Sequence, residues 1–585
     1  MANPLRIANC SGFYGDRLAA AREMLEDGPI DFLTGDYLAE LTMTILWKAR
    51  QKDASRGYAV TFLKQMEQVL GVALDNGVKI VANAGGLNPA GLANELRALN
   101  QRLGLNARIL HVAGDDLLPK IDDLYKAGHK LQHLDRGVPL QKQGVTPLSA
   151  NAYLGCWGIV EALNQGADIV VCPRVTDASV VVGPAAWHFG WQPDNWDRLS
   201  GAVVAGHVIE CGTQCTGGNY AFFKDVPGLE HPGFPIAEIY EDGSTVITKH
   251  EGTGGLVSVG TVTAQLLYET AEPAYYNPDV VSRFDTIQIE QQGPDRVRLF
   301  DIRGEPAPEN VKVCLNYLGG FRNQMTFVLT GLDIQAKADL VERTLRHELD
   351  VTQFDLFDVC LANTAAQDAE TNQEAAALLK VTVKSQDRKI VGRAFSSKIV
   401  ELALASYPGL FTTTPPTDGN AFAVYWPTLV PADIPEHVVV LEDGSEISIP
   451  PTASRKDATK IVCSSCPDIA VPAGPTIKLP LGTVFGARSG DKGGNANVGV
   501  WGPSDEAYAW LAATMTVELF QQMIPETSSL EVLRFELPNL RSLNFVVVGL
   551  LGEGVASSIR FDGQAKSLGE YLRSRFVDLP ESLLG

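Results

Sequence analysis

The stretch GADIVVCPRVTDAS, residues 166–179, joins a short apolar run to a polar turn. Over about the first 190 residues the same order recurs: an apolar strand, a polar or glycine-containing turn, and an amphipathic helix. The other three strands are expected at 6–10, 79–82 and 108–112. Strands that alternate with helices predict a parallel sheet. The sequence therefore predicts an α/β fold whose large N-terminal domain contains a mostly parallel sheet.

Two of the expected helices place apolar residues at every third or fourth position, so each has one face to pack on the sheet. We expect these residues in the core: Phe62, Met66, Val69, Ala73, Leu92, Leu96, Leu99 and Leu103. Ligands of open α/β sheets bind beyond the carboxyl ends of the strands. The polar turns that follow the strands are therefore the candidate site.

The rest of the chain divides at a proline-rich stretch. Residues 236–250 predict a hairpin with an Asp-Gly turn, whereas the recurring prolines between 415 and 480 argue against long helices. After Pro480 we expect a strand with a glycine-rich loop, a helix over 504–523, strands over 530–551 and a helix over 565–577. The predicted domains are an α/β domain at 1–450, a junction at 451–477 and a small α+β domain at 478–585.

Composition excludes several classes of function. The formal net charge of −21 disfavours nonspecific binding to nucleic acid or to anionic lipid surfaces. No apolar run approaches the roughly 20 residues of a membrane-spanning helix, and the first residues show no secretory signal. Nine cysteines, an odd count, fit reduced thiols better than a disulfide framework. We expect a cytoplasmic protein, and base rates favour a homo-oligomer.

The glycine-rich stretch FGARSGDKGGNANVGVWG, residues 485–502, is one candidate site for an anion. Consecutive glycines let backbone N–H groups point into one concavity, and a neighbouring lysine adds charge, which suits a phosphate or a carboxylate. The spacing is not that of a nucleoside triphosphate loop. The alternative is a tight turn with solvated side chains. The candidate binding residues are Arg488, Ser489, Asp491 and Lys492.

The stretch HVIECGTQCTGGNY, residues 207–220, is a candidate catalytic segment. Glu210 is a candidate for proton transfer, and Cys215 or Cys211 is a candidate nucleophile if its pKa is lowered. The alternative is ordinary buried thiols, and a lone CxxxC does not make a zinc site. The turn that follows offers hydrogen-bond donors to a substrate, from Gly217, Gly218 and Asn219.

Three other turns contribute candidates. Arg174 is predicted to clamp a carboxylate, and Asp177 is either a base or the residue that orients Arg174; a buried turn pair is the alternative. Asp36 in LTGDYLAE is expected to cap a helix, and it is also a candidate for substrate binding. The turn NAGGLNP supplies Gly85 and Gly86 as further donors.

Other motifs argue against cofactors. The CSSC at 463–466 lacks the helix of a thioredoxin-like motif, and SGFYGDR at 11–17 lacks the third glycine of a dinucleotide fingerprint. The turn KHEGTGG at 249–255 is similar to an anion-receptive turn, in which His250 is expected to be structural. We expect no metal and no redox cofactor.

Taken together, eight collinear motifs resemble the acyclic terpene utilisation A family over nearly the whole chain. They are SGFYGDR, DFLTGDYLAE, VANAGGLNP, GADIVVCPRVTDAS, IECGTQCTGGN, TKHEGTGG, GTVTAQLLYE and ARSGDKGGNANVGV. The resemblance implies a large N-terminal domain up to about residue 450 and a small ferredoxin-like domain that carries the SGDKG motif. No role is carried over to residues 280–400, where no motif matches.

The resemblance also implies a function. The family is associated with operons that degrade citronellol and geraniol through CoA thioesters. We therefore expect an enzyme that adds or removes water, or cleaves next to a carbonyl, on a branched or terpenoid acyl-CoA, with CoA as part of the substrate and no other cofactor. Alternatives are a noncatalytic binding subunit that partners a biotin-dependent acyl-CoA carboxylase, and an oxidoreductase.

Overall fold

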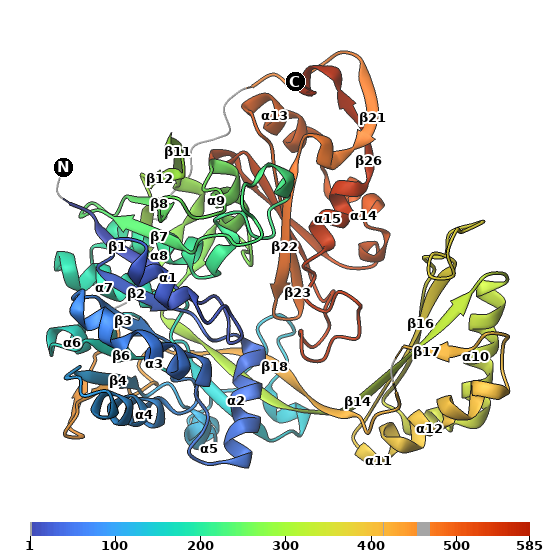
Figure 1. Ribbon diagram of the computed structural model, residues 1–585, viewed down its shortest axis with the longest axis horizontal. Helices are drawn as coiled ribbons and strands as arrows, with labels where there is room; N and C mark the ends of the chain where they lie inside the picture. The colour runs from blue at the N-terminus through green and yellow to red at the C-terminus, as the bar shows by residue number, and fades with distance from the viewer. Residues whose placement is uncertain (1–2, 414, 453–468, 585) are drawn as a thin grey trace. The chain divides into compact units, whose positions relative to one another are not determined.

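The computed structural model describes residues 3–413, 415–452 and 469–584 (Figure 1). The chain forms two compact units. The first comprises residues 1–316, 425–555 and 562–585, and the second comprises residues 317–424 and 556–561. The CSSC motif lies outside the described residues. Within the described part, no helix combines the length and the apolar character needed to cross a bilayer.

The first unit is built on an eleven-stranded sheet whose centre is parallel. All four strands expected from the βα pattern are present, and the α/β prediction is confirmed. A fifth parallel strand, Phe32–Gly35, was not expected, because its residues precede what was interpreted as a helix cap. The parallel strands, in spatial order, are β1 (Leu5–Asn9), β2 (Phe32–Gly35), β3 (Lys79–Ala82), β6 (Ile169–Val171) and β4 (Ile109–Ala113).

Antiparallel strands extend this sheet at both edges. The predicted hairpin is present: Gly243 adopts a φ of +86° in its turn, and Asp242 Oδ1 accepts a hydrogen bond from the backbone N–H of Ser244 at 2.9 Å. Beside β1 lie β7 (Pro235–Ile239), β8 (Thr245–Lys249), β12 (Arg296–Phe300) and β11 (Gln288–Gly293), and beside β4 lie β19 (Val438–Val440) and β20 (Glu446–Ser448).

Two groups of helices cover the sheet (Figure 1). The predicted apolar stripes are buried, with one exception: Leu103 lies just beyond the end of its helix and is 41% exposed, because the helix ends at Arg102. One group is α1 (Ala20–Glu26), α3 (Val60–Asp75) and α4 (Pro89–Arg102), and the other is α6 (Trp157–Asn164), α7 (Ser179–Phe189) and α8 (Trp196–Ile209).

The ferredoxin-like part of the first unit is a four-stranded antiparallel sheet with helices. Its SGDKG motif is not a loop, because it forms a strand paired with the next one in a tight hairpin. The single helix expected over 504–523 is two, since Thr516 accepts from the N–H of Leu519 and starts a second helix. The elements are β22 (Gly486–Lys492), β23 (Asn495–Trp501), β25 (Ser542–Val547), β24 (Val532–Leu537), α13 (Asp505–Thr514), α14 (Val517–Met523), α15 (Leu568–Ser574) and the pair β21 (Thr476–Pro480) and β26 (Phe576–Pro580).

The second unit contains an antiparallel sheet with helices packed on one face, drawn mostly in yellow in Figure 1. One of its strands is 21 residues long. Its core joins apolar residues of two strands to those of the helices, including Val381, Phe395 and Val341. The main elements are β14 (Asn310–Thr330), β16 (Ala376–Ser385), β15 (Leu356–Ala362), α10 (Ile334–Glu348) and α12 (Arg393–Glu401).

Leu96 and Leu103 allow a direct comparison of a core leucine with an exposed one. Leu96 is completely buried on the same helix. We expect Leu96→Ala to lower the free energy of unfolding by about 2 to 5 kcal/mol, because it removes buried methyl groups and leaves a cavity. Leu103→Ala is expected to change it by less than about 0.5 kcal/mol. Urea denaturation of both variants checks this, and equal losses would contradict the packing described.

Candidate functional site

Polar side chains gather where the parallel strands β2 and β3 end. Asp36 directly follows β2 and Asn83 directly follows β3. Asn83 Nδ2 donates to Asp36 Oδ1 at 2.5 Å, and Asn83 Oδ1 accepts from the N–H of Tyr37 at 2.8 Å. The predicted helix cap is wrong: helix α2 (Glu40–Lys52) begins after Ala39, and the backbone N–H that donates to Asp36 is that of Leu38, in the loop before the helix. Burial, together with the Asp177 carboxylate, raises the pKa of Asp36 well above its ordinary value.

The turn after β6 brings Arg174 into the same region. Its side chain is 2% exposed, and Nη1 lies 2.7 Å from Asp177 Oδ1. The guanidinium stacks over the ring of Tyr153 at 4.1 Å. Asp115, which follows β4, accepts from the N–H of Arg174 and from the Asn151 amide. The pairing of Arg174 with Asp177 is thus present, in a buried setting.

The end of α8 places His207 against Glu210. His207 Nε2 lies 3.0 Å from the carbonyl oxygen of Gln265, which only accepts, so Nε2 carries the proton and Nδ1 has the lone pair. Glu210 Oε1 lies 3.1 Å from that Nδ1. Burial and the nearby Lys492 lower the pKa of His207 to about 4, while burial and the carboxylate of Asp177 raise the pKa of Glu210 well above its ordinary value.

Burial therefore favours a neutral imidazole and a protonated carboxyl group at this contact, rather than two opposite charges. His207 Nδ1 is buried and makes no hydrogen bond with the described residues. Glu210 Oε2 is buried and has no hydrogen-bond partner among the described residues. The carboxyl group thus has one oxygen 3.1 Å from the histidine and the other available to a bound molecule.

Strand β22 of the ferredoxin-like part brings two cations to the cluster. Lys492 Nζ donates to the carbonyl oxygen of Glu269 at 2.8 Å. Arg488 donates to the side chain of Gln214, and its guanidinium lies 4.4 Å above the ring of Tyr268. Burial lowers the pKa values of both Lys492 and Arg488. Both cations predicted from the sequence thus lie beside the cluster, on a strand and not on a loop.

The glycine of SGDKG serves close packing. A Cβ atom at Gly490 would lie 2.4 Å from Cε2 of Tyr268, so only glycine lets the strand approach this ring. Ser489 Oγ accepts from the N–H of Gly569, which ties the strand to α15. Burial and the Glu269 carboxylate raise the pKa of Asp491 to about 8. Instead of the predicted concavity of backbone N–H groups, the segment forms a strand that presents charged side chains.

Other candidates of the segment 207–220 lie in structural positions. The Cys215 thiol is buried, donates to the carbonyl of Gly212 with an S···O distance of 3.8 Å, and has its pKa raised by burial. This disfavours a thiolate, and the pKa of Cys211 is likewise raised by burial and by Glu210. Asn219 is exposed, with a φ of +58°. Gly217 and Gly218 form the turn, where a Cβ would meet Val226 at 2.6 Å and the Thr213 carbonyl oxygen at 2.9 Å, respectively.

The two glycines after β3 have a similar packing role. The N–H of Gly85 donates to the carbonyl of Cys172 at 3.0 Å, and a Cβ there would lie 2.6 Å from that oxygen. A Cβ at Gly86 would lie 2.3 Å from a methyl group of Leu46, and its φ is +51°. Both glycines therefore allow the turn to pack tightly next to Asn83.

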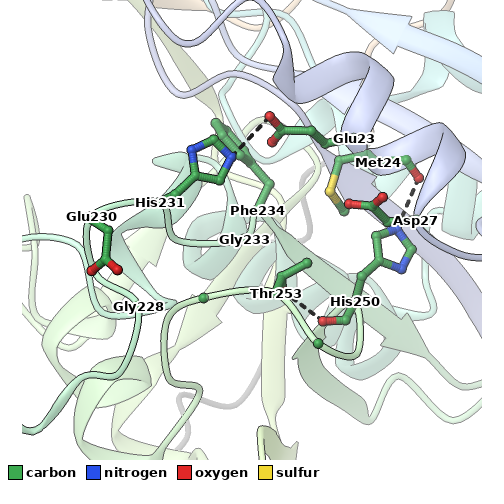
Figure 2. A pocket seen from close by; sticks show the side chains of 12 residues that line it. Glu23, Met24, Asp27, Gly228, Glu230, His231, Gly233, Phe234, His250 and Thr253 are labelled. Carbon is green, nitrogen blue, oxygen red and sulfur yellow. Dashed lines mark hydrogen bonds and ion pairs between the residues drawn. The ribbon is translucent and has the colours of Figure 1, made fainter.

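A separate pocket of about 330 Å³ lies beside the KHEGTGG turn (Figure 2). Glu23, Asp27 and Glu230 contribute to its lining, so its charge does not suit the anion expected for this turn. His250 Nε2 donates to the carbonyl of Met24 at 3.0 Å, which agrees with the structural role expected for this histidine. Figure 2 shows His231 facing Glu23, with Nε2 and Oε1 3.2 Å apart.

Comparison with family models agrees with the architecture. Residues 5–441 match the model of the acyclic terpene utilisation family protein AtuA, and residues 479–578 match that of the AtuA ferredoxin-like domain. The chain belongs to the acyclic terpene utilisation family AtuA. No curated protein and no solved structure matches it. The ferredoxin-like part of this AtuA family member is the part that supplies Arg488 and Lys492.

Several residues of the cluster were given no role from the sequence, although Glu40 was considered as a residue that faces the same turns as Asp36. Glu40 accepts from the Tyr153 hydroxyl at 2.9 Å and lies 3.8 Å from Lys312 Nζ. Although burial acts in the opposite direction, Lys312 and Arg174 lower the pKa of Glu40 to about 2. His207 and Glu269 were inside quoted motifs, but a single histidine or glutamate has no spacing that marks it.

The described residues offer no ready metal centre. No three His, Cys, Asp or Glu side chains in this part of the chain are grouped as a metal ion requires. The cysteines that the structure describes are free thiols. The chemistry of the cluster is therefore argued from its carboxyl groups, its imidazole and its cations.

Because the backbone at Gly490 lies so close to the ring of Tyr268, one added methyl group at this position is expected to lower the stability of the fold. We expect Gly490→Ala to lower the free energy of unfolding by about 1 to 3 kcal/mol, because the ring of Tyr268 must move. Gly71→Ala is the control, since a Cβ there meets nothing within 4 Å on helix α3; it is expected to stabilise by up to about 1 kcal/mol. Chemical denaturation measures both, and a neutral Gly490→Ala would rule out the tight contact.

The burial of Asp115 predicts a dependence of stability on pH. Burial raises the pKa of Asp115 to about 7, whereas an unfolded aspartate ionises near pH 4. The folded state therefore holds the proton more tightly, and the free energy of unfolding falls as the pH rises from 4 to 7, by about 1.4 kcal/mol per pKa unit.

The variant Asp115→Asn cannot ionise, so its free energy of unfolding should decline less between pH 4 and pH 8 than that of the unmodified chain. The exposed neighbour Asp116 provides the control, as Asp116→Asn. Denaturation curves across this pH range test the prediction. Identical pH profiles for the Asp115→Asn variant and the unmodified chain would contradict it.

Proposed function

We propose that this chain is an enzyme of acyclic terpenoid or branched-chain catabolism that adds water to, or removes it from, an acyl-CoA thioester. Family membership supports the pathway. The observation that supports the chemistry is Glu210: a buried carboxyl group with a raised pKa, whose Oε1 lies 3.1 Å from His207 Nδ1 and whose Oε2 has no partner among the described residues. Such a group is suited to proton transfer near neutral pH.

Four side chains divide the reaction among them. In the hydration direction, Asp177 accepts a proton from water as the water oxygen bonds to the β-carbon of an α,β-unsaturated thioester. The double-bond electrons move to the thioester oxygen, which becomes an enolate oxygen. Arg174 and Lys492 stabilise its negative charge, and in a buried site this is a large contribution to catalysis. Glu210 then gives its proton to the α-carbon, and the thioester carbonyl re-forms.

The arrangement of charges supports these roles. Arg174 Nη1 lies 2.7 Å from Asp177 Oδ1, so a cation orients the proposed base. Burial raises the pKa of Glu210 and thus favours its acid form, next to an imidazole whose pKa is lowered. Two carboxyl groups in different environments thus divide the tasks of base and acid. The protonated Glu210 is regenerated when the proton taken up by Asp177 is returned through solvent.

Glu210→Gln tests this proposal sharply. Glutamine has the shape of the protonated glutamic acid, so we expect an unchanged melting temperature, whereas turnover should fall by about 100-fold or more, because the proton is lost. Purified protein is incubated with a panel of branched and terpenoid acyl-CoAs, and products that differ by one water are followed by mass spectrometry. Glu95→Gln, an exposed position on α4, is the control.

Two outcomes would count against the proposal. Full turnover by Glu210→Gln would remove Glu210 from the chemistry. No turnover of any thioester by the unmodified chain, combined with co-purification of a biotin-dependent acyl-CoA carboxylase, would favour the noncatalytic binding subunit instead.

A further inference from the structure

The second unit has a positively charged sheet face. Arg322 on β14 is directly opposite Lys384 on β16 in the antiparallel register. Lys380 is four residues before Lys384 on β16, so both point to the same face. Like charges directly opposite each other on a sheet are destabilising. A sheet face that carries three cations is unusual in a chain whose formal net charge is −21.

The opposite face of β16 is part of the apolar core under the helices, through Leu379, Val381 and Val383. The cations therefore lie on the face that the helices do not cover. There they meet the segment 556–561. Lys384, Arg322 and Lys380 donate to three successive carbonyl oxygens, those of Ser557 at 2.6 Å, Ser558 at 2.7 Å and Ile559 at 2.5 Å.

These carbonyl oxygens carry no net charge, so they do not neutralise the cations. Among the described residues, neither Arg322 nor Lys380 forms an ion pair, and Asp358 on β15, which opposes Thr382 on β16, forms none either. Lys380 is only 4% exposed, and its ammonium group lies 4.0 Å from the ring centre of Phe561. A buried charge is costly unless it is paired. Burial lowers the pKa of Lys380, and Arg322 and Arg560 act in the same direction, although Cys360 and Asp358 partly offset them.

Hydrogen-bond donors also remain for a ligand. Arg322 has five N–H groups and Lys380 has three, and each gives one hydrogen bond within the described part of the chain. An anion with several oxygens can accept from the donors that remain. Phosphate groups fit best, because they combine full charge with acceptors in several directions.

We propose that Arg322, Lys380 and Lys384 form a binding site for a phosphate or diphosphate group on this face of the second unit. The site shares no residue with the cluster around Glu210. Its ligand is either a small inorganic anion or the phosphorylated part of a larger molecule, such as coenzyme A. A bound anion adds negative charge near Arg322 and Lys384, which are opposite each other on the sheet.

Isothermal titration calorimetry of the full chain tests this site without any turnover, so a failed reaction assay leaves the test intact. The probes are inorganic pyrophosphate and coenzyme A. We expect Lys380→Met to weaken binding of the probe roughly tenfold or more, because one charge-assisted contact is lost. Lys398→Met is the matched control, since Lys398 lies in the same unit but is paired with Glu401 at 2.8 Å.

Arg322→Gln is the second variant, for the case in which Lys380→Met does not fold. Binding of pyrophosphate that the variants weaken identifies a site for the anion itself. Binding of coenzyme A alone, weakened in the same way, identifies a site for a larger phosphorylated ligand. Absence of binding for both probes, or affinities that neither variant changes, would overturn the proposal and leave the three cations as anchors of the segment 556–561 only.

Discussion

The site depends on one constraint: ionisable groups have been removed from water. Burial favours the neutral form of a carboxyl group and of an imidazole. In the cluster it raises the pKa of Asp36 and Glu210 and lowers that of His207. The same burial makes the remaining charges, on Arg174 and its partner Asp177, more effective, because little solvent screens them.

The fold produces this burial by bringing separate elements together. Parallel strands end in turns that carry Asp36 and Arg174, the last turn of α8 carries His207, and β22 carries Lys492. The ferredoxin-like part approaches closely enough only because residue 490 has no side chain. Glycines in the quoted motifs thus act mainly through packing, and the chemistry belongs to the charged residues between them.

The sequence predicted the α/β architecture, the βα units and the hairpin, because these depend on local periodicity. It also named Glu210, Asp177, Arg174 and Lys492 as candidates, because they occupy turns or glycine-rich segments; their roles are part of the proposal. It did not reveal the strand nature of SGDKG, since glycine-rich segments have weak local preferences, nor the histidine tautomer at His207. Both features depend on which groups meet in space. So does the cation face around Lys380, because the register of β14 and β16 determines which residues lie opposite each other.

Isotope-edited infrared spectroscopy of the carboxyl groups at pH 7 tests the central claim most directly. The chain is labelled with ¹³C at its glutamate carboxyl carbons and compared with the Glu210→Gln variant. We predict a carbonyl band typical of a protonated glutamic acid that is absent from the variant. A spectrum in which Glu210 contributes only to the carboxylate band would contradict the account.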